Sequence, residues 1–185
     1  MGAEENPSYF RGDDLPVEMV SWKDTQEFCR KLGAALDLPE GWEVKLPTEA
    51  QWEYACRAGT STPFSFGESL NGNQANCDGK YPYGTETTGE SLGKTRPVGA
   101  YGPNVWGLLD MHGNVSEWCQ DWYGEHYYSD AQRNPTGPAV GSSRVLRGGS
   151  WHGHALYCRS AFRYWYAPSL RSSNLGLRVV VSSTL

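Results

Sequence analysis

Side chains capable of chemistry are concentrated between residues 150 and 158. This stretch contains the Ser150 hydroxyl, the imidazoles of His152 and His154, and the Cys158 thiol. Zinc and copper accept such ligands, but no carboxylate or third ligand is spaced to complete a metal site. Acyl transfer at Ser150 would need an orienting partner and an oxyanion site, and neither is recognisable in the sequence. We therefore interpret the two histidines as loop residues.

The cysteines are predicted to be small buried residues of a reduced protein. Five is an odd number, and no CxxC pair occurs, so a disulfide framework is less favoured. Free cysteines weakly favour a cytoplasmic location, and the first ten residues lack the basic and apolar regions of a signal peptide. The cysteines are Cys29, Cys56, Cys77, Cys119 and Cys158.

Composition narrows the possible partners. The 185 residues carry a net charge of −5 with a pI of about 5.4, and no basic stripe is visible. Nucleic acid is therefore disfavoured as a partner, and no apolar stretch approaches the roughly 20 residues of a membrane span. Aromatic residues make up 13 % of the chain, which argues against disorder and leaves rings for a binding surface. The length suits one domain.

Two helices are predicted near the start of the chain. Ser21 with Asp24 predicts a capped helix that ends by residues 37–41, and Thr48 with Gln51 predicts a second capped helix that ends at Gly59. The expected inward positions are Trp22, Phe28, Cys29, Leu32 and Leu36 in the first helix, and Trp52, Tyr54, Ala55 and Cys56 in the second.

The region from Thr60 to Val145 is predicted to contain loops and short strands but no helix. Gly, Pro, Asn and Asp recur every few residues there. Loops this long are unusual in a compact domain and need ions or tryptophan packing to hold them. Further strands are expected at Arg144–Leu146 and Leu175–Ser182, with a tight turn at 147–151.

Several ordered motifs carry a resemblance to a known family. They include LPTEAQWEYA at 46–55, WGLLDMHGNVSEW at 106–118, RVLRGGSW at 144–151 and CRSA at 158–161. Over nearly the whole chain the sequence resembles the sulfatase-modifying-factor family of formylglycine-generating enzymes. The resemblance implies one domain at 1–185 with an α+β, C-type-lectin-like fold, made of two N-terminal helices, short strands and long loops.

The resemblance also bears on catalysis. Family enzymes oxidise a peptidyl cysteine with two cysteines that bind copper(I), a soft ion suited to two thiolates. In this sequence the second cysteine aligns with Cys158, but the first aligns with Gly153. One thiolate cannot make the two-sulfur site, so no copper is expected and catalysis is not favoured.

The C-terminal segment at 151–175 is predicted to be a ligand-binding loop. Its spacing resembles the variable region of diversity-generating-retroelement proteins built on this fold, although a mutated asparagine codon cannot give Trp165. Rings interleaved with small polar residues are typical of a paratope. Trp151 and Phe162 are expected to fill the core beneath. The candidate ligand-binding residues are His152, Gly153, His154, Leu156, Tyr157, Phe162, Tyr164, Trp165, Tyr166, Ser169, Ser172 and Ser173.

The family resemblance implies two structural calcium sites. Carboxylate and carbonyl oxygens suit this hard ion, although ordinary turn hydrogen bonding is the alternative explanation. One site would use the side chains of Asn76 and Glu90 with the carbonyls of Cys77 and Leu92. The other would use Asp110 and Glu117 with the carbonyls of Gly113 and Val115.

Three hypotheses follow from the sequence. The leading one is a non-catalytic module that binds a protein or other ligand through the 151–175 loop. The alternative is a formylglycine-generating-type oxidase or another metal-dependent enzyme of the family. Because the family usually has strands ahead of the segment at residues 1–8, a third hypothesis is a structural or regulatory domain of a larger protein.

Overall fold

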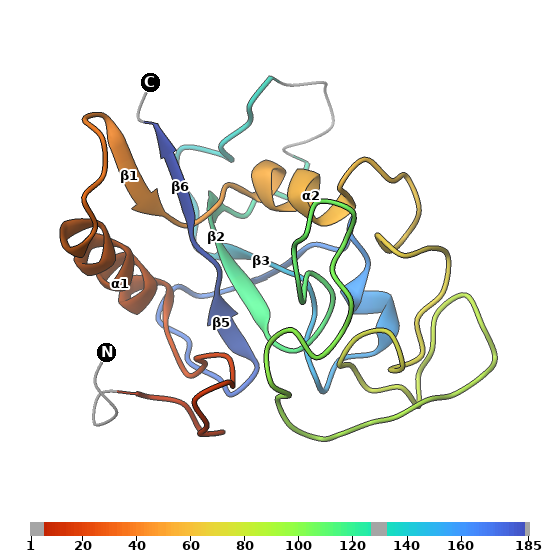
Figure 1. Cartoon of the computed structure of the whole chain (residues 1–185). Helices are drawn as coiled ribbons and strands as arrows, with labels where there is room; N and C mark the ends of the chain where they lie inside the picture. The colour runs from red at the N-terminus through yellow and green to blue at the C-terminus, as the bar shows by residue number, and fades with distance from the viewer. Residues whose placement is uncertain (1–5, 127–132, 184–185) are drawn as a thin grey trace.

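The computed structural model describes residues 6–126 and 133–183, in which two helices and two small sheets are linked by long loops (Figure 1). Residues 1–8 form the segment ahead of which the family usually has strands. Residues 1–5 of that segment lie outside the described range. The elements in chain order are α1 (Trp22–Ala35), β1 (Trp42–Lys45), α2 (Glu49–Arg57), β2 (Ser116–Trp122), β3 (Arg144–Arg147), the 3₁₀ helix η2 (Ala155–Cys158), β4 (Tyr164–Tyr166), β5 (Leu175–Leu177) and β6 (Val180–Ser183).

Both helices begin at the residues that the sequence predicts. The Ser21 hydroxyl accepts from the Asp24 amide at 3.2 Å, and the Asp24 carboxylate accepts from the Ser21 amide at 2.8 Å. Thr48 and Gln51 repeat this reciprocal arrangement at 3.2 and 2.9 Å. Each capping residue contributes about 1 kcal/mol to helix stability, and together they fix where the two helices start.

Burial along the helices agrees with the prediction at most positions, since Trp22, Leu32 and Ala55 are half-buried against the core. Cys29, Trp52 and Cys56 are buried. The expected burial of Tyr54 is wrong, because its side chain is 70 % exposed and packs edge-on against the exposed Trp106 ring at 4.8 Å.

The ends of the two helices also depart from the prediction in part. Leu36 is 44 % exposed because it lies at the C-cap, beyond the last turn of α1. In α2 the left-handed C-cap residue is Ala58, with φ 47°, and Gly59 follows it.

The strands form a four-stranded sheet in the order β4-β3-β2-β5 and a two-stranded sheet of β1 and β6. β5 runs parallel to β2, and the other pairs are antiparallel. Trp118 on β2 is fully buried and packs with Leu146 and Leu175 of the adjacent strands, while α1 lies against β1. β2 therefore forms the centre of the core.

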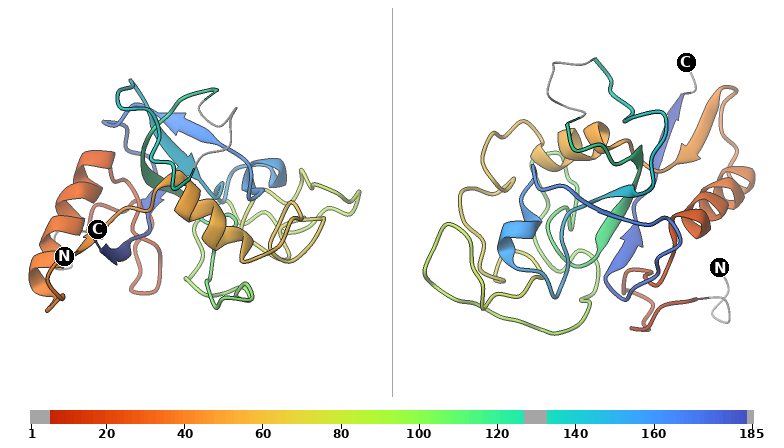
Figure 2. Two further views of the ribbon diagram at one scale, coloured as in Figure 1. Left: turned by 90° about the horizontal axis from the view of Figure 1, so that it is seen from above. Right: turned by 180° about the vertical axis from the view of Figure 1, so that it is seen from behind.

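The predicted strand at Leu175–Ser182 is two strands in the structure. β5 belongs to the larger sheet and β6 to the smaller one, so this part of the chain crosses from one to the other (Figures 1 and 2). The break falls at Arg178 and Val179, where the Arg178 guanidinium turns to the Glu117 carboxylate at 2.8 Å. The residue that pairs with Glu117 therefore lies at the break between the two strands, within a segment that the sequence predicts as one strand.

The stretch from residue 60 to β2 has no helix, as predicted, and its loops lie on the opposite side of the four-stranded sheet from α1 (Figure 2). Within the described part of the chain, no helix is long and apolar enough to cross a membrane.

His112 fastens these loops to the C-terminal segment. Its Nδ1 lies 2.8 Å from the Cys158 carbonyl and its Nε2 accepts from the Ser65 amide at 3.0 Å. These contacts fix the Nδ1–H tautomer. Burial lowers the pKa of His112 to about 4, so the ring is neutral at pH 7.

Candidate ligand-binding site

The 151–175 loop leaves β3 through two glycines, forms η2 and β4, and returns to β5. Gly148 and Gly149 have left-handed φ values of 92° and 72°, which residues with a side chain rarely adopt. A Cβ atom on Gly149 would lie 2.6 Å from the Cys158 sulfur. Glycine is therefore required at this turn by conformation and by space, and the turn brings η2 close to β3.

Arg147 fixes the backbone of the loop. Its guanidinium is fully buried and donates to the carbonyls of Ser160, at 2.6 Å, and Phe162. It also pairs with the Glu53 carboxylate and lies 5.2 Å from the Trp52 ring. One side chain of β3 therefore ties the loop to α2.

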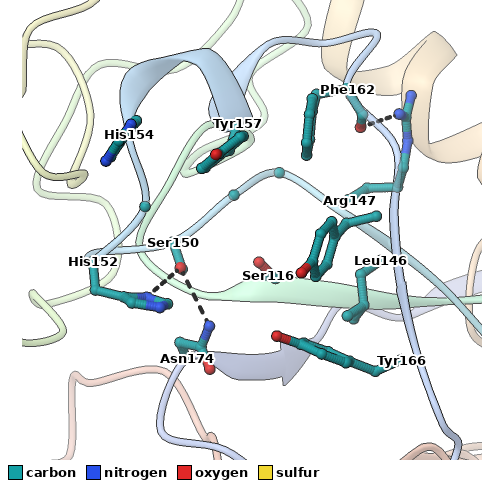
Figure 3. A pocket seen from close by; sticks show the side chains of 14 residues that line it. Ser116, Leu146, Arg147, Ser150, His152, His154, Tyr157, Phe162, Tyr166 and Asn174 are labelled. Carbon is teal, nitrogen blue, oxygen red and sulfur yellow. Dashed lines mark hydrogen bonds between the residues drawn. The ribbon is translucent and has the colours of Figure 1, made fainter. Parts of the chain in front are cut away.

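A cavity of about 250 Å³ opens between β3 and the loop (Figure 3). Seven of the predicted ligand-binding residues line it, together with residues from β2, β3 and the turn. Those seven are His152, Gly153, His154, Tyr157, Phe162, Tyr164 and Tyr166.

One end of the cavity is polar. The Ser150 hydroxyl lies 3.0 Å from Nδ1 of His152 and accepts from the Asn174 amide at 3.5 Å (Figure 3). Burial lowers the pKa of His152, which the charge of Asp78 only partly opposes. These groups are therefore uncharged near neutral pH and provide hydrogen bonds rather than a counterion.

Aromatic rings form a continuous row along the loop. Tyr81 stacks on His154 at 3.9 Å, His154 on Tyr157 at 5.5 Å, and Tyr157 contacts Phe162 at 4.9 Å. Phe162 in turn lies 6.3 Å from Tyr164. Tyr157 and Tyr164 are 39 % and 43 % exposed, so the row is a surface and not a core.

The remaining predicted residues lie outside the cavity. Trp165 is 42 % exposed on the other face of β4 and stacks on Tyr123 at 4.1 Å. Leu156 is also exposed. Ser169 is exposed, and Ser172 and Ser173 hold the return of the loop through their backbone carbonyls.

The expectation that Trp151 and Phe162 fill the core is wrong for Phe162, which is half-buried and lines the cavity. Trp151 is also only half-buried; its indole N–H donates to the Ser173 carbonyl at 3.1 Å and its ring contacts Phe10.

Sequence reasoning missed Tyr81, Ser116, Tyr123 and Asn174. Tyr81 and Tyr123 extend the row of rings, while Ser116 and Asn174 line the cavity. Tyr81, Ser116 and Tyr123 lie outside the 151–175 loop and reach it only through tertiary structure, whereas Asn174 lies within the loop. Asn174 directly precedes β5, which is the one local signal that could have found it.

Cys158 is fully buried, as predicted, and has a sulfur neighbour. A hydrogen bond between the two thiols lowers the pKa of Cys77 and, together with burial, raises the pKa of Cys158. The partner thus comes from the 60–115 loops and not from position 153. Neither sulfur lines the cavity, so the pair is separated from any ligand bound there.

Gly153, the position that the family resemblance aligns with the first cysteine, lies on the cavity wall. A Cβ atom there would meet the Ser150 carbonyl at 3.5 Å and the Tyr157 ring at 3.6 Å, which are ordinary contacts. The position would accept a Cβ atom without strain.

The first group of predicted calcium ligands includes Asn76, which is buried. Its amide nitrogen donates to the Lys94 carbonyl at 3.0 Å and to the Asn114 side-chain oxygen at 3.2 Å. Its own side-chain oxygen has no hydrogen-bond partner within residues 6–126 and 133–183, an arrangement that a cation would satisfy. The Glu90 carboxylate is half-exposed and lies 3.7 Å from Arg96. Cys77 is buried and Leu92 half-buried in the same loops.

The second group lines one hollow. Asp110, Gly113, Val115 and Glu117 meet there, and Arg178 lines it as well. Burial raises the pKa of Asp110, whose carboxylate accepts from the Gly99 amide at 2.6 Å. Glu117 is held by Arg178 and by the Trp52 indole at 2.6 Å. An arginine thus already neutralises one of the two carboxylates.

The sulfatase-modifying factor enzyme 1-like domain matches residues 2–183. The chain belongs to this family. It is 39 % identical over 172 residues to a formylglycine-generating enzyme of Streptomyces coelicolor, covering 88 % of this chain and 51 % of that protein. It is 34 % identical over 178 residues to inactive C-alpha-formylglycine-generating enzyme 2 of Mus musculus, covering 92 % and 50 %. The chain spans about half the length of these two curated relatives.

Among solved structures, Treponema denticola variable protein 1 is similar at a TM-score of 0.84 and 31 % identity, over 97 % of this chain and 78 % of that one. These likenesses confirm the expected fold, an α+β domain of the C-type-lectin-like, formylglycine-generating-enzyme type.

Proposed function

We propose that this domain is a non-catalytic ligand-binding module whose binding surface is the aromatic row and cavity of the 151–175 loop. The observation that carries the proposal is Gly153, which stands on the cavity wall where the family's first catalytic cysteine aligns. The cavity therefore has binding groups but no thiol. Exposed tyrosines on a rigidly anchored loop are typical anchors of protein interfaces.

Two of the similar proteins support this proposal. A relative of similar identity carries the name of an inactive enzyme, and a solved relative is named a variable protein. We infer from the latter, and from the spacing of the loop residues, that the surface is one a retroelement can diversify. Sequencing the neighbouring DNA tests this point: a near-identical template repeat beside a reverse-transcriptase gene is expected, and the absence of both contradicts it.

Copper(I) binding and peptide oxidation test the non-catalytic assignment. We expect the native protein neither to bind copper(I) tightly in competition with a chromogenic chelator nor to convert a cysteine-containing peptide to its formylglycine form by mass spectrometry. The variant Gly153→Cys restores a thiol on the cavity wall and serves as the positive comparison. Turnover by the native protein would establish the alternative, an oxidase that uses Cys158 with another partner.

Selection from a displayed polypeptide library tests ligand binding directly. Binders are expected to lose about tenfold or more in affinity when Tyr157 or Tyr164 is changed to Ala, since truncating an interface anchor costs more than about 1.4 kcal/mol. Tyr54→Ala is the matched control, because Tyr54 is an exposed tyrosine on α2. Equal losses in all three variants, or none, would contradict the proposed surface.

We also propose that calcium stabilises the long loops, with the group around Asn76 as the stronger site because of its unpaired buried oxygen. A ligand at 100 times its Kd adds about 2.7 kcal/mol to folding stability. Millimolar calcium should therefore raise the melting temperature relative to EGTA, and Asn76→Leu should abolish the difference. Identical melting curves in calcium and EGTA would contradict calcium binding. The same measurement on Glu117→Gln tests whether the second group of ligands contributes.

A further inference from the structure

The cavity accepts a group the size of one side chain. Pockets for drug-sized ligands measure about 300–1,000 Å³, whereas a cavity of about 150 Å³ holds one benzene molecule. At about 250 Å³, this cavity has room for an aromatic ring with a polar substituent but not for an extended ligand.

The walls of the cavity suit an aromatic guest. Figure 3 shows Tyr157 and Phe162 on one side and Tyr166 on the other, with Leu146 at one end of the space between them. Tyr164 also lines the cavity and lies 6.3 Å from Phe162 and 5.2 Å from Tyr166. Rings bound among rings gain edge-to-face and offset contacts beyond the burial of their surface. At one end, Ser150, His152 and Asn174 form the hydrogen-bonded group described above.

The charge of the cavity excludes ionised guests. No carboxylate or lysine is among the residues that line it in the described part of the chain. Arg147 does line it, but its guanidinium is fully buried and already bonded to Glu53 and to two carbonyls. An ammonium or carboxylate entering the cavity would lose its hydration without gaining a counterion.

We propose that the cavity is a subsite for a neutral aromatic side chain with a hydrogen-bonding tip, tyrosine above all, presented by a polypeptide partner. The inference rests on the proposed ligand-binding function and specifies its anchor. The phenol hydroxyl both donates and accepts, so it can join the Ser150 and His152 hydrogen bond while its ring lies among Tyr157, Phe162 and Tyr166. Phenylalanine would fill the same space without that bond.

Binding of N-acetyl-tyrosinamide, followed by protein NMR, tests the subsite. The amide signals of residues 150–154 and of Asn174 should shift, and the affinity should exceed that of N-acetyl-phenylalaninamide about five- to tenfold, the effect of one hydrogen bond. N-acetyl-lysinamide and the amide of N-acetyl-glutamate should bind at least about tenfold more weakly than the tyrosine compound. Equal binding of the charged compounds would overturn the proposal.

A variant that fills the cavity tests whether tyrosinamide binds inside it. Gly153→Leu adds a side chain at a position with only ordinary contacts, and it should abolish tyrosinamide binding without unfolding the protein. Gly102→Leu is the control, because a Cβ atom there meets nothing within 4 Å. If the Gly153→Leu variant still binds tyrosinamide, the compound binds elsewhere and the proposed subsite is wrong.

The subsite and the ligand-binding function fail in different ways. If library-selected polypeptides bind through Tyr157 and Tyr164 but need no aromatic residue and tolerate Gly153→Leu, the subsite is wrong and the module stands. If no polypeptide depends on the aromatic row, the module itself is wrong, whatever the amino-acid amides do.

Discussion

Two buried groups with shifted pKa values have opposite effects on the stability of this protein in acid. Burial lowers the pKa of His112 to about 4 and raises the pKa of Asp121 to about 6. For His112 the unfolded chain takes up the proton first, so its contribution to stability is complete above about pH 6.5 and is lost as the pH falls toward 4. For Asp121 the folded chain holds the proton longer, so stability rises as the pH falls from about 6 to 4. The two effects oppose each other.

Asp121→Asn should therefore make the protein more sensitive to acid, not less. With the Asp121 contribution removed, the His112 contribution, at most about 3 kcal/mol at 1.36 kcal/mol per pKa unit, is no longer opposed by Asp121 between pH 6.5 and 4. Urea unfolding at pH 7 and 4.5 measures the difference, and NMR titration of the His112 ring gives its pKa directly. A pH dependence equal to that of the native protein would contradict the opposing roles.

At the residue scale, the sequence predicts which side chains are buried better than it predicts which groups they contact. Cys158 is buried as expected, yet its sulfur neighbour Cys77 lies far from it in the chain. The same holds for Glu117, whose buried charge is matched by Arg178. Composition indicates whether a side chain tends to be buried, but only the folded chain determines which group it meets.

At the scale of elements, β3 holds the binding loop through Arg147. Replacing Arg147 by Met leaves the carbonyls of Ser160 and Phe162 without this donor, while Glu53 keeps Arg57 at 2.8 Å. Leaving a buried acceptor unsatisfied costs about 1–3 kcal/mol for each group. Urea unfolding should show this loss, and amide exchange near residues 160–162 should accelerate.

Arg30→Met is the control for this variant. Arg30 pairs with Glu27 on the surface of α1, where both side chains are at least half exposed, and such pairs contribute about 0–1 kcal/mol. If Arg147→Met folds only partly, Arg147→Lys keeps the charge and should lose less stability. Equal losses for Arg147→Met and Arg30→Met would show that the loop has another anchor.

Helices and strands whose boundaries depend on neighbouring residues in the chain are the ones that the sequence predicts correctly. The helix starts at Ser21 and Thr48 depend on side chains three residues apart and were predicted correctly. β2 was not singled out, because Glu117 and Asp121 lie buried inside it and break the alternation that marks a strand. β4 was missed since its three residues become a strand only beside β3.

At the scale of the molecule, the residues that hold the fold and those that form the binding surface are largely different. Arg147, Cys158 and Ser160 are buried, whereas Tyr157 and Tyr164 of the aromatic row, and Leu156 and Trp165 beside it, are 38–43 % exposed. Changing these four exposed residues to Ala together should cost about 2 kcal/mol in total, at roughly 0.5 kcal/mol per surface site.

Circular dichroism and urea unfolding of the four-alanine variant check this separation, with binding of library-selected polypeptides measured alongside. Cooperative unfolding should persist while binding is lost. A variant that no longer unfolds cooperatively would show that the rings support the fold as well as the ligand.

The pairing of β1 with β6 joins residues 42–45 to residues 180–183. Such a distant contact is slow to form. During synthesis, α1 and β1 leave the ribosome long before their closing strand exists, and the apolar face of β1 has to wait for it. The smaller sheet is thus expected to form late in folding, and until it forms the exposed apolar side chains of β1 favour aggregation.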